Sequence, residues 1–124
     1  MSTIKTFRDL EVWRKAHDLV LLIYAITKSF PTDERYGLVS QLRRAALSVA
    51  TNIVEGFKRR SVNDSLHFYN MSEASLEEVK YELMVSRDLR YINNDIYQQS
   101  NNLAEEVSRL LYGWRNSQRC NARN

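Results

Sequence analysis

The chain has 124 residues, a formal net charge of +3, one cysteine, three glycines and one proline. So few helix breakers argue against a protein of many β-strands, and the lone Cys120 excludes an intramolecular disulfide. This length fits one domain over residues 1–124, which needs no stabilising metal, so we predict a single all-α domain.

The first predicted helix covers residues 9–29 and ends before Phe30-Pro31, because a residue that precedes proline disfavours the helical conformation. Its segment LVLLIYAI, residues 19–26, is apolar around nearly the whole helix circumference. This segment is too short to span a bilayer, and the N-terminal sequence does not resemble a signal peptide. We therefore expect a cytoplasmic protein without a membrane anchor, in which part of this apolar surface contacts another subunit.

The second predicted helix, residues 38–59, combines a polar stripe with an unusually broad apolar surface. The stripe consists of Gln41, Arg44, Ser48, Asn52 and Glu55. We predict that it forms a buried network in which Arg44 pairs with Glu78 or Glu82 of the third helix. The apolar residues on the far side are Val39, Ala46, Leu47, Ala50, Val54 and Phe57. Surplus apolar surface on two helices favours a homo-oligomer, and a larger core within one subunit is the alternative.

The third helix is expected over residues 64–92 and the fourth over residues 95–116, separated by the helix breaker Asn93-Asn94. Apolar residues recur along the fourth helix at spacings of three and four. The remaining residues, 117–124, are predicted to form a flexible polar tail. Short connections between long helices favour an antiparallel, up-down-up-down four-helix bundle.

Several segments together resemble a known family. They are FRDLEVWRKAHDLVLLIY, the connector FP-x-x-E-x-YGL at residues 30–38, QLRRAALSVATNIVEG and SLEEVKYEL. The chain resembles, from residue 7 to residue 114, a family of small bacterial four-helix-bundle proteins first described from intervening sequences of large-subunit ribosomal RNA genes.

The resemblance implies a left-handed bundle and a barrel-like homopentamer. A more distant similarity is to the accessory protein of diversity-generating retroelements, a pentameric bundle with basic surface that works with a reverse transcriptase and RNA. The resemblance implies no settled enzymatic activity.

Local clusters of cations are the main functional signal, because phosphate binding depends on clustering more than on net charge. The candidate nucleic-acid-binding residues are Arg43, Lys58, Arg59, Arg60, Arg115 and Arg119. Residues 58–60 have a second interpretation, since cations at a helix C-terminus also complement the helix dipole. Arg43 lies off the polar stripe, which favours an exposed position or a contact between subunits. The tail arginines are typical either of a solvated chain end or of a flexible arm that binds nucleic acid.

Catalytic and metal-site patterns are weak. The only approach to a di-iron motif is Asp64-x-x-His67, and no Cys or His cluster has zinc spacing. His17 lies between apolar helix positions and is interpreted as a core or interface histidine. We therefore expect no enzymatic activity, metal or cofactor.

The sequence predicts an oligomeric helical protein that presents basic surface to RNA or a ribonucleoprotein. The alternatives are a purely structural or protein-interaction module and an accessory protein to a retroelement reverse transcriptase.

Overall fold

The computed structural model describes residues 3–123, and the side chains of residues 3–121. This part of the chain contains four long helices and two short 3-10 helices, and no strand. The elements are η1 (Phe7–Asp9), α1 (Glu11–Thr27), η2 (Thr32–Glu34), α2 (Leu38–Lys58), α3 (Val62–Asp88) and α4 (Asn94–Arg123). The prediction of an all-α protein with four helices is confirmed. Among residues 3–123, none of the helices contains an apolar stretch of the length that a bilayer-spanning segment requires.

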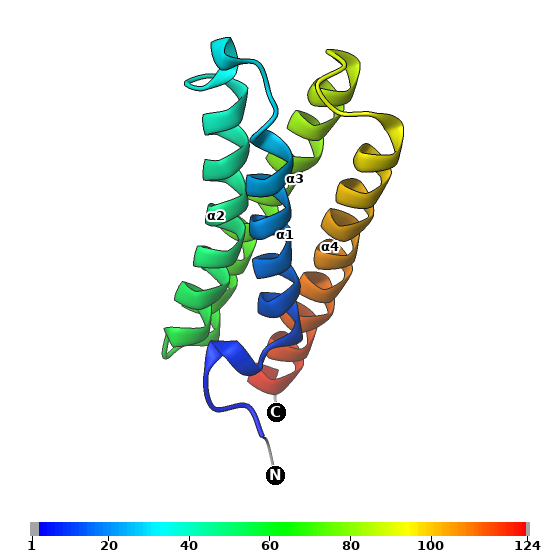
Figure 1. The fold of residues 1–124 in the computed structure, drawn as a ribbon. Helices are drawn as coiled ribbons and strands as arrows, with labels where there is room; N and C mark the ends of the chain where they lie inside the picture. The colour runs from blue at the N-terminus through cyan, green and yellow to red at the C-terminus, as the bar shows by residue number, and fades with distance from the viewer. Residues whose placement is uncertain (1–2, 124) are drawn as a thin grey trace.

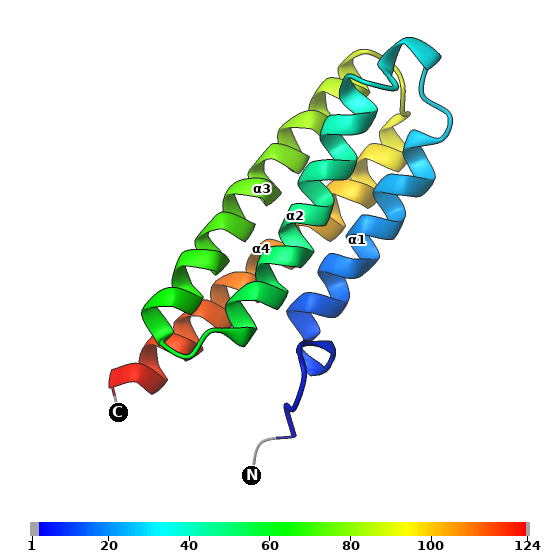
Figure 2. The ribbon, with the colours of Figure 1, turned by 90° about the vertical axis from the view of Figure 1, so that its left-hand side faces the viewer.

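The four long helices lie side by side (Figures 1 and 2). Each of α1 and α3 packs against both α2 and α4, and α2 packs most extensively on α3. The helices α1 and α3 therefore lie on one diagonal of the bundle, and α2 and α4 lie on the other. The turn between α2 and α3 lies at the same end as η1 and the end of α4.

Serine side chains of α3 form hydrogen bonds across its contact with α2. Ser72 Oγ donates to the Val49 carbonyl at 2.7 Å, and Ser65 Oγ donates to the Gly56 carbonyl at 2.7 Å. Residue numbers fall along α2 as they rise along α3, so these two helices run in opposite directions. Small side chains at the contact let the helix backbones approach closely, and each hydroxyl is satisfied by the facing helix.

The first helix is shorter than predicted because a separate turn precedes it. Thr6 and Asp9 form a capping box around η1, and Leu10 then adopts an extended conformation with φ −79° and ψ 123°. Residues 9–29 are therefore not one helix, since α1 begins at Glu11 and ends at Thr27.

The third helix also ends earlier than predicted. It begins at Val62 after the cap Ser61, whose Oγ accepts from the Asp64 N–H at 3.1 Å. It ends at Asp88 instead of residue 92, because Arg90 adopts a left-handed conformation with φ 65°. The buried Ile92 follows in the connector.

The predicted end of the fourth helix at residue 116 is wrong, because α4 continues to Arg123 through most of the segment predicted as a flexible polar tail. The segment after Trp114 contains neither glycine nor proline, so nothing in its covalent structure stops the helix. Arg115 also attaches this part of α4 to α3, as described below. Residue 124 lies outside the described part of the chain.

Glu34 joins two connectors at the other end of the bundle. Its Oε1 accepts from the backbone N–H of Leu38 at 3.2 Å and so caps α2, while its Oε2 accepts from the Tyr91 hydroxyl at 2.8 Å. A Cβ on Gly37 would lie 2.8 Å from Glu34 Oε1, so glycine leaves room for this carboxylate. These contacts give a structural reason for Glu34 and Gly37 in the FP-x-x-E-x-YGL segment.

The apolar far side of α2 is largely covered within the chain. Val39, Ala46 and Ala50 are buried, and Leu47 is 44 % exposed. In α1 the surplus is mainly Leu21, which is 56 % exposed. The core is thus larger than the sequence suggested, and the apolar surface left for a partner is smaller.

Candidate nucleic-acid interface

The predicted polar stripe of α2 divides into separate groups. Asn52 Nδ2 donates to the carbonyl of Ser48 at 2.9 Å and to its Oγ at 3.0 Å, and Ser48 Oγ is 2.7 Å from Ser75 Oγ. Gln41 and Arg44 are exposed instead, and Glu55 forms an ion pair with Arg59. The five residues of the stripe therefore do not form one network.

The partner of the buried part of the stripe is a serine, not Glu78 or Glu82. Within residues 3–123, Arg44 forms no ion pair with either carboxylate. The signal that sequence reasoning missed is the recurrence of serines along the apolar seam of α3. These serines are Ser65, Ser72, Ser75 and Ser86.

Arg43 and Arg44 exchange the roles that the sequence suggested. Arg43 Nε donates to Thr27 Oγ1 at 3.0 Å, and its guanidinium lies over the Tyr24 ring, 4.6 Å from the centroid. Arg43 also donates to the Tyr24 carbonyl at 3.4 Å, so it complements the C-terminal end of α1. Arg43 is half-buried and structural, whereas Arg44 is the exposed residue.

Glu82 is a carboxylate without a hydrogen-bond partner for its buried Oε1 among the described residues. Burial raises the pKa of Glu82 from 4.5 to about 7, and the neighbouring negative charge of Glu78 adds to this effect. The folded protein therefore binds a proton at Glu82 more tightly than the unfolded chain does.

We expect the Glu82 carboxyl group to stabilise the fold fully below about pH 4.5 and to lose this contribution as the pH rises through about 7. The Glu82→Gln variant should then be more stable than the parent at pH 8 by about 1 kcal/mol, a value reduced for solvent screening. At pH 4 the two proteins should unfold at nearly the same urea concentration. A less stable variant at pH 8 would instead indicate that a cation of another subunit pairs with Glu82.

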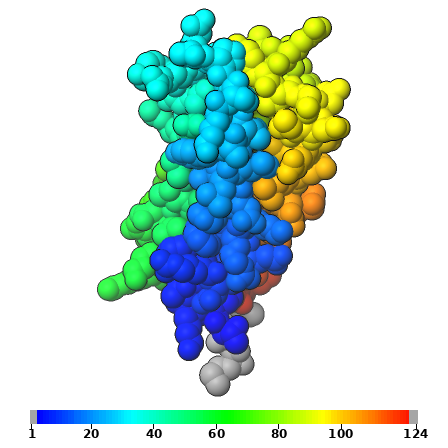
Figure 3. Space-filling model, viewed as in Figure 1, coloured from blue at the N-terminus to red at the C-terminus, as the bar shows by residue number. Residues whose placement is uncertain are grey.

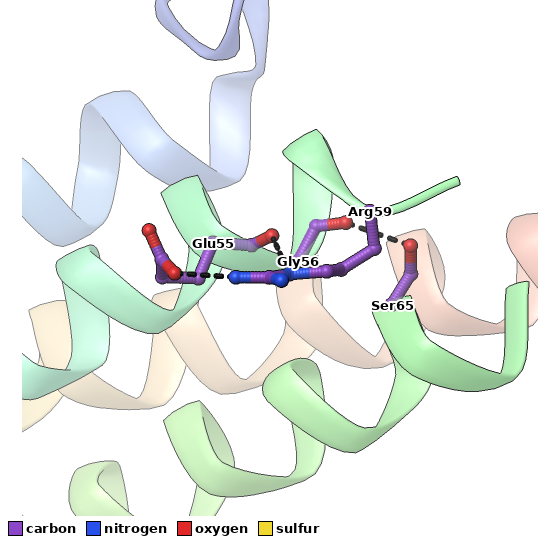
Figure 4. A network of polar contacts seen from close by, with 4 residues as sticks. All are labelled: Glu55, Gly56, Arg59 and Ser65. Atoms are coloured by element: carbon purple, nitrogen blue, oxygen red, sulfur yellow. Dashed lines mark hydrogen bonds and ion pairs between the residues drawn. The ribbon is translucent and has the colours of Figure 1, made fainter. Parts of the chain in front are cut away.

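Arg59, which follows the end of α2, is held by Glu55 of α2 and by Phe68 of α3. Its NH2 pairs with Glu55 Oε1 at 2.6 Å, and its Nε donates to the Glu55 carbonyl at 3.3 Å (Figure 4). Its guanidinium carbon lies 4.4 Å from the centroid of the Phe68 ring on α3. Gly56 and Ser65, joined by their hydrogen bond, fix the start of α3 beside this arginine.

Lys58 and Arg60 are the free cations of the same turn. Both are exposed, and neither forms an ion pair within the described part of the chain. In the space-filling view the end of α2 and the following turn, in green, project from the body of the molecule (Figure 3). The charges of Lys58 and Arg60 are thus available to a ligand.

Of the two predicted binding residues on α4, Arg115 is paired within the chain and, among the described residues, Arg119 is free. Arg115 NH2 pairs with Glu73 at 2.7 Å, its NH1 donates to Asn70 at 2.8 Å, and its side chain is only 12 % exposed. Arg119 is exposed and has no ion pair among residues 3–121. The fold thus uses Arg115 to hold α4 on α3.

Three of the six predicted binding residues therefore remain free: Lys58, Arg60 and Arg119. The segments that carry them are the end of α2, the turn that follows it and the last part of α4, and these segments lie at one end of the bundle together with η1 (Figures 1 and 2). Lys5, Arg8 and Arg14 add exposed cations at this end. We call this surface, comprising Lys5, Arg8, Arg14, Lys58, Arg60 and Arg119, the basic end.

His17 does not lie in the core of the subunit, so of the two predicted positions, core or interface, only the interface remains as a prediction. His17 is exposed, and its ring stacks on Trp13 with centroids 5.1 Å apart. In the described part of the chain, no group of three or more His, Cys, Asp or Glu side chains is placed to hold a metal ion.

These features define a class of protein: an all-α protein of four long helices, with exposed cations at the end of the bundle that carries η1. Residues 8–113 match the sequence profile of the 23S rRNA-intervening sequence protein family, and the chain belongs to that family.

A similar fold occurs in a crystal structure of a protein of unknown function from the S23 ribosomal protein family of Bacteroides thetaiotaomicron. The similarity has a TM-score of 0.78 at 23 % sequence identity, and it covers 84 % of this chain and 97 % of that one. It therefore bears on the fold alone. No curated protein sequence is significantly similar to this chain.

Proposed function

We propose that this protein is a non-enzymatic, homo-oligomeric bundle that binds RNA, alone or in a ribonucleoprotein, through its basic end. The observation that carries the proposal is the group of exposed cations Lys58, Arg60 and Arg119, which the intrachain ion pairs leave free. Phosphate contacts made by such cations supply most of the affinity of non-specific nucleic-acid binding.

The unit of assembly in this proposal is an antiparallel, up-down-up-down bundle, and resemblance suggests five copies. Around a cyclic oligomer, each copy of the basic end adds one more contact for the same RNA, which raises the overall affinity. A cytoplasmic location belongs to the same proposal.

Replacing Lys58, Arg60 and Arg119 together with glutamine should weaken binding to single-stranded RNAs of unrelated sequence. The slope of log affinity against log salt should become shallower by about 0.7 for each phosphate contact that is lost. Fluorescence anisotropy at several salt concentrations measures both quantities.

The matched control changes Lys28, Arg35 and Arg90 to glutamine, since these exposed cations lie in the connectors at the opposite end of the bundle. This variant has the same net charge as the test variant and should retain the slope of the parent protein. Equal slopes for the two variants would mean that the RNA responds to total charge, and the basic end would lose its assigned role.

A second candidate function, assembly or protein interaction without RNA, is favoured by apolar side chains left at the surface. The most exposed on the long helices include Leu21, Leu47, Met71, Tyr81 and Met84. The two candidates separate experimentally, because an interaction module would show no salt-dependent RNA binding even at low salt.

Oligomerisation itself predicts that Leu47→Arg gives smaller particles, because an interface tolerates an unpaired charge poorly. Native mass spectrometry should show the reduced mass while circular dichroism shows unchanged helix content. The control for the added charge is Thr3→Arg, because Thr3 is exposed in the N-terminal segment and lies outside the helices. A parent protein that is monomeric at micromolar concentration would contradict the proposed assembly.

A further inference from the structure

We propose that Arg59 binds an unpaired RNA base by stacking, while Lys58 and Arg60 contact the backbone phosphates. This inference rests on the proposed function and assigns its ligand class: single-stranded RNA in preference to a duplex. The three adjacent cations then have two different roles.

The geometry of Arg59 separates it from its neighbours. The Glu55 carboxylate holds one edge of the guanidinium at 2.6 Å (Figure 4). The Phe68 ring lies on one side of it, with its centroid 4.4 Å from the guanidinium carbon. The side chain nevertheless remains 40 % exposed. Arg59 is therefore fixed in position and still accessible to a ligand.

The local charge makes Arg59 a poor phosphate ligand. Glu55 already neutralises the guanidinium and occupies part of its donor edge, and its own negative charge would repel a phosphate group. A guanidinium that is paired at its edge keeps a flat, weakly hydrated face, which suits stacking on an aromatic base. The Phe68 ring packs against the other face of the Arg59 guanidinium, in a cation–π contact.

Lys58 and Arg60 lie next to Arg59 in the sequence, and no ion pair within the described residues neutralises either of them. Free cations beside a stacking platform are the combination that single-strand-binding proteins use, with charge for the backbone and flat groups for the bases. Bases inside a duplex are already stacked and paired, so they offer no free face to Arg59.

The test compares Arg59→Lys with Arg60→Lys in the full-length protein. Both changes keep the charge, and we expect lysine at position 59 to pair with Glu55 as arginine does. Only Arg59→Lys removes the guanidinium that lies on the Phe68 ring. The probes are a short single-stranded RNA that carries one fluorescent purine analogue and a fully paired duplex of the same sequence. Thermal unfolding monitored by circular dichroism checks that both variants are folded.

We expect Arg59→Lys to weaken single-strand binding about tenfold and to abolish the fluorescence change of the stacked purine. The salt slope should stay the same, since no phosphate contact is lost. Arg60→Lys should change the affinity less than about twofold, and neither variant should alter duplex binding.

Phe68→Leu gives an independent measurement, because it keeps all three cations and removes the ring beneath Arg59. It should weaken single-strand binding without changing the salt slope. Unchanged single-strand affinity in both Arg59→Lys and Phe68→Leu would overturn the stacking role.

The outcomes for the parent protein separate this inference from the proposed function. Equal, salt-dependent binding of duplex and single strand would overturn the stacking role and leave RNA binding in place. Absence of salt-dependent binding to both probes would overturn the proposed function as well.

Discussion

Replacing Gly56 with alanine should lower the free energy of unfolding by about 3 kcal/mol, because the new methyl group overlaps a buried ring. A Cβ at this position would lie within 3.0 Å of three atoms of the Tyr69 ring. Tyr69 is 1 % exposed and also contacts Trp114 edge to face, with centroids 6.4 Å apart, so the ring cannot easily move away. Chemical denaturation of the purified variant measures the loss.

Gly113 provides the control, since it lies in α4 and a Cβ there would meet no atom within 4 Å. Gly113→Ala should stabilise the protein by about 0.5 to 1 kcal/mol through helix propensity alone. In a Tyr69→Leu background, Gly56→Ala should cost much less than in the parent protein. An equal cost in both backgrounds would show that Tyr69 is not the residue that requires glycine at position 56.

Arg115→Met should lower the free energy of unfolding by about 2 kcal/mol. The change removes a charge-assisted contact with Glu73 and a hydrogen bond with Asn70, both of which join α4 to α3. The expected loss is below that for a fully buried ion pair, because Glu73 is 45 % exposed and water can solvate its carboxylate after the change. Methionine keeps most of the apolar volume of the arginine stem.

The matched control is Arg119→Met, one helical turn further along α4. Arg119 is exposed and unpaired in the described part of the chain, so its stability change should stay within about 0.5 kcal/mol. The two variants should show the opposite order in RNA binding, where Arg115→Met keeps the parent salt slope and Arg119→Met reduces it. A stability loss of less than about 0.5 kcal/mol for Arg115→Met would contradict its structural role.

The pattern of apolar residues determined the class of the fold, because helical periodicity and the scarcity of glycine and proline are properties of the sequence itself. The start of α2 and its end, within one residue, were predictable on the same basis. The ends of α1, α3 and α4 were not. They depend on the capping box at Thr6, the left-handed conformation of Arg90 and the attachment of Arg115 to α3.

The sequence by itself also identified the cations that a nucleic-acid site requires, since charge and clustering are visible in the chain. Only the tertiary structure decided which of them are free. Arg43 and Arg115 are bound by groups far away in the sequence, and Arg59 by a carboxylate one turn before it. Helical spacing fixes which residues share a face, but it does not identify the facing residue of another helix. That depends on how the helices pack, which is why the partner of Ser48 is Ser75 and why Arg44 lies in solvent.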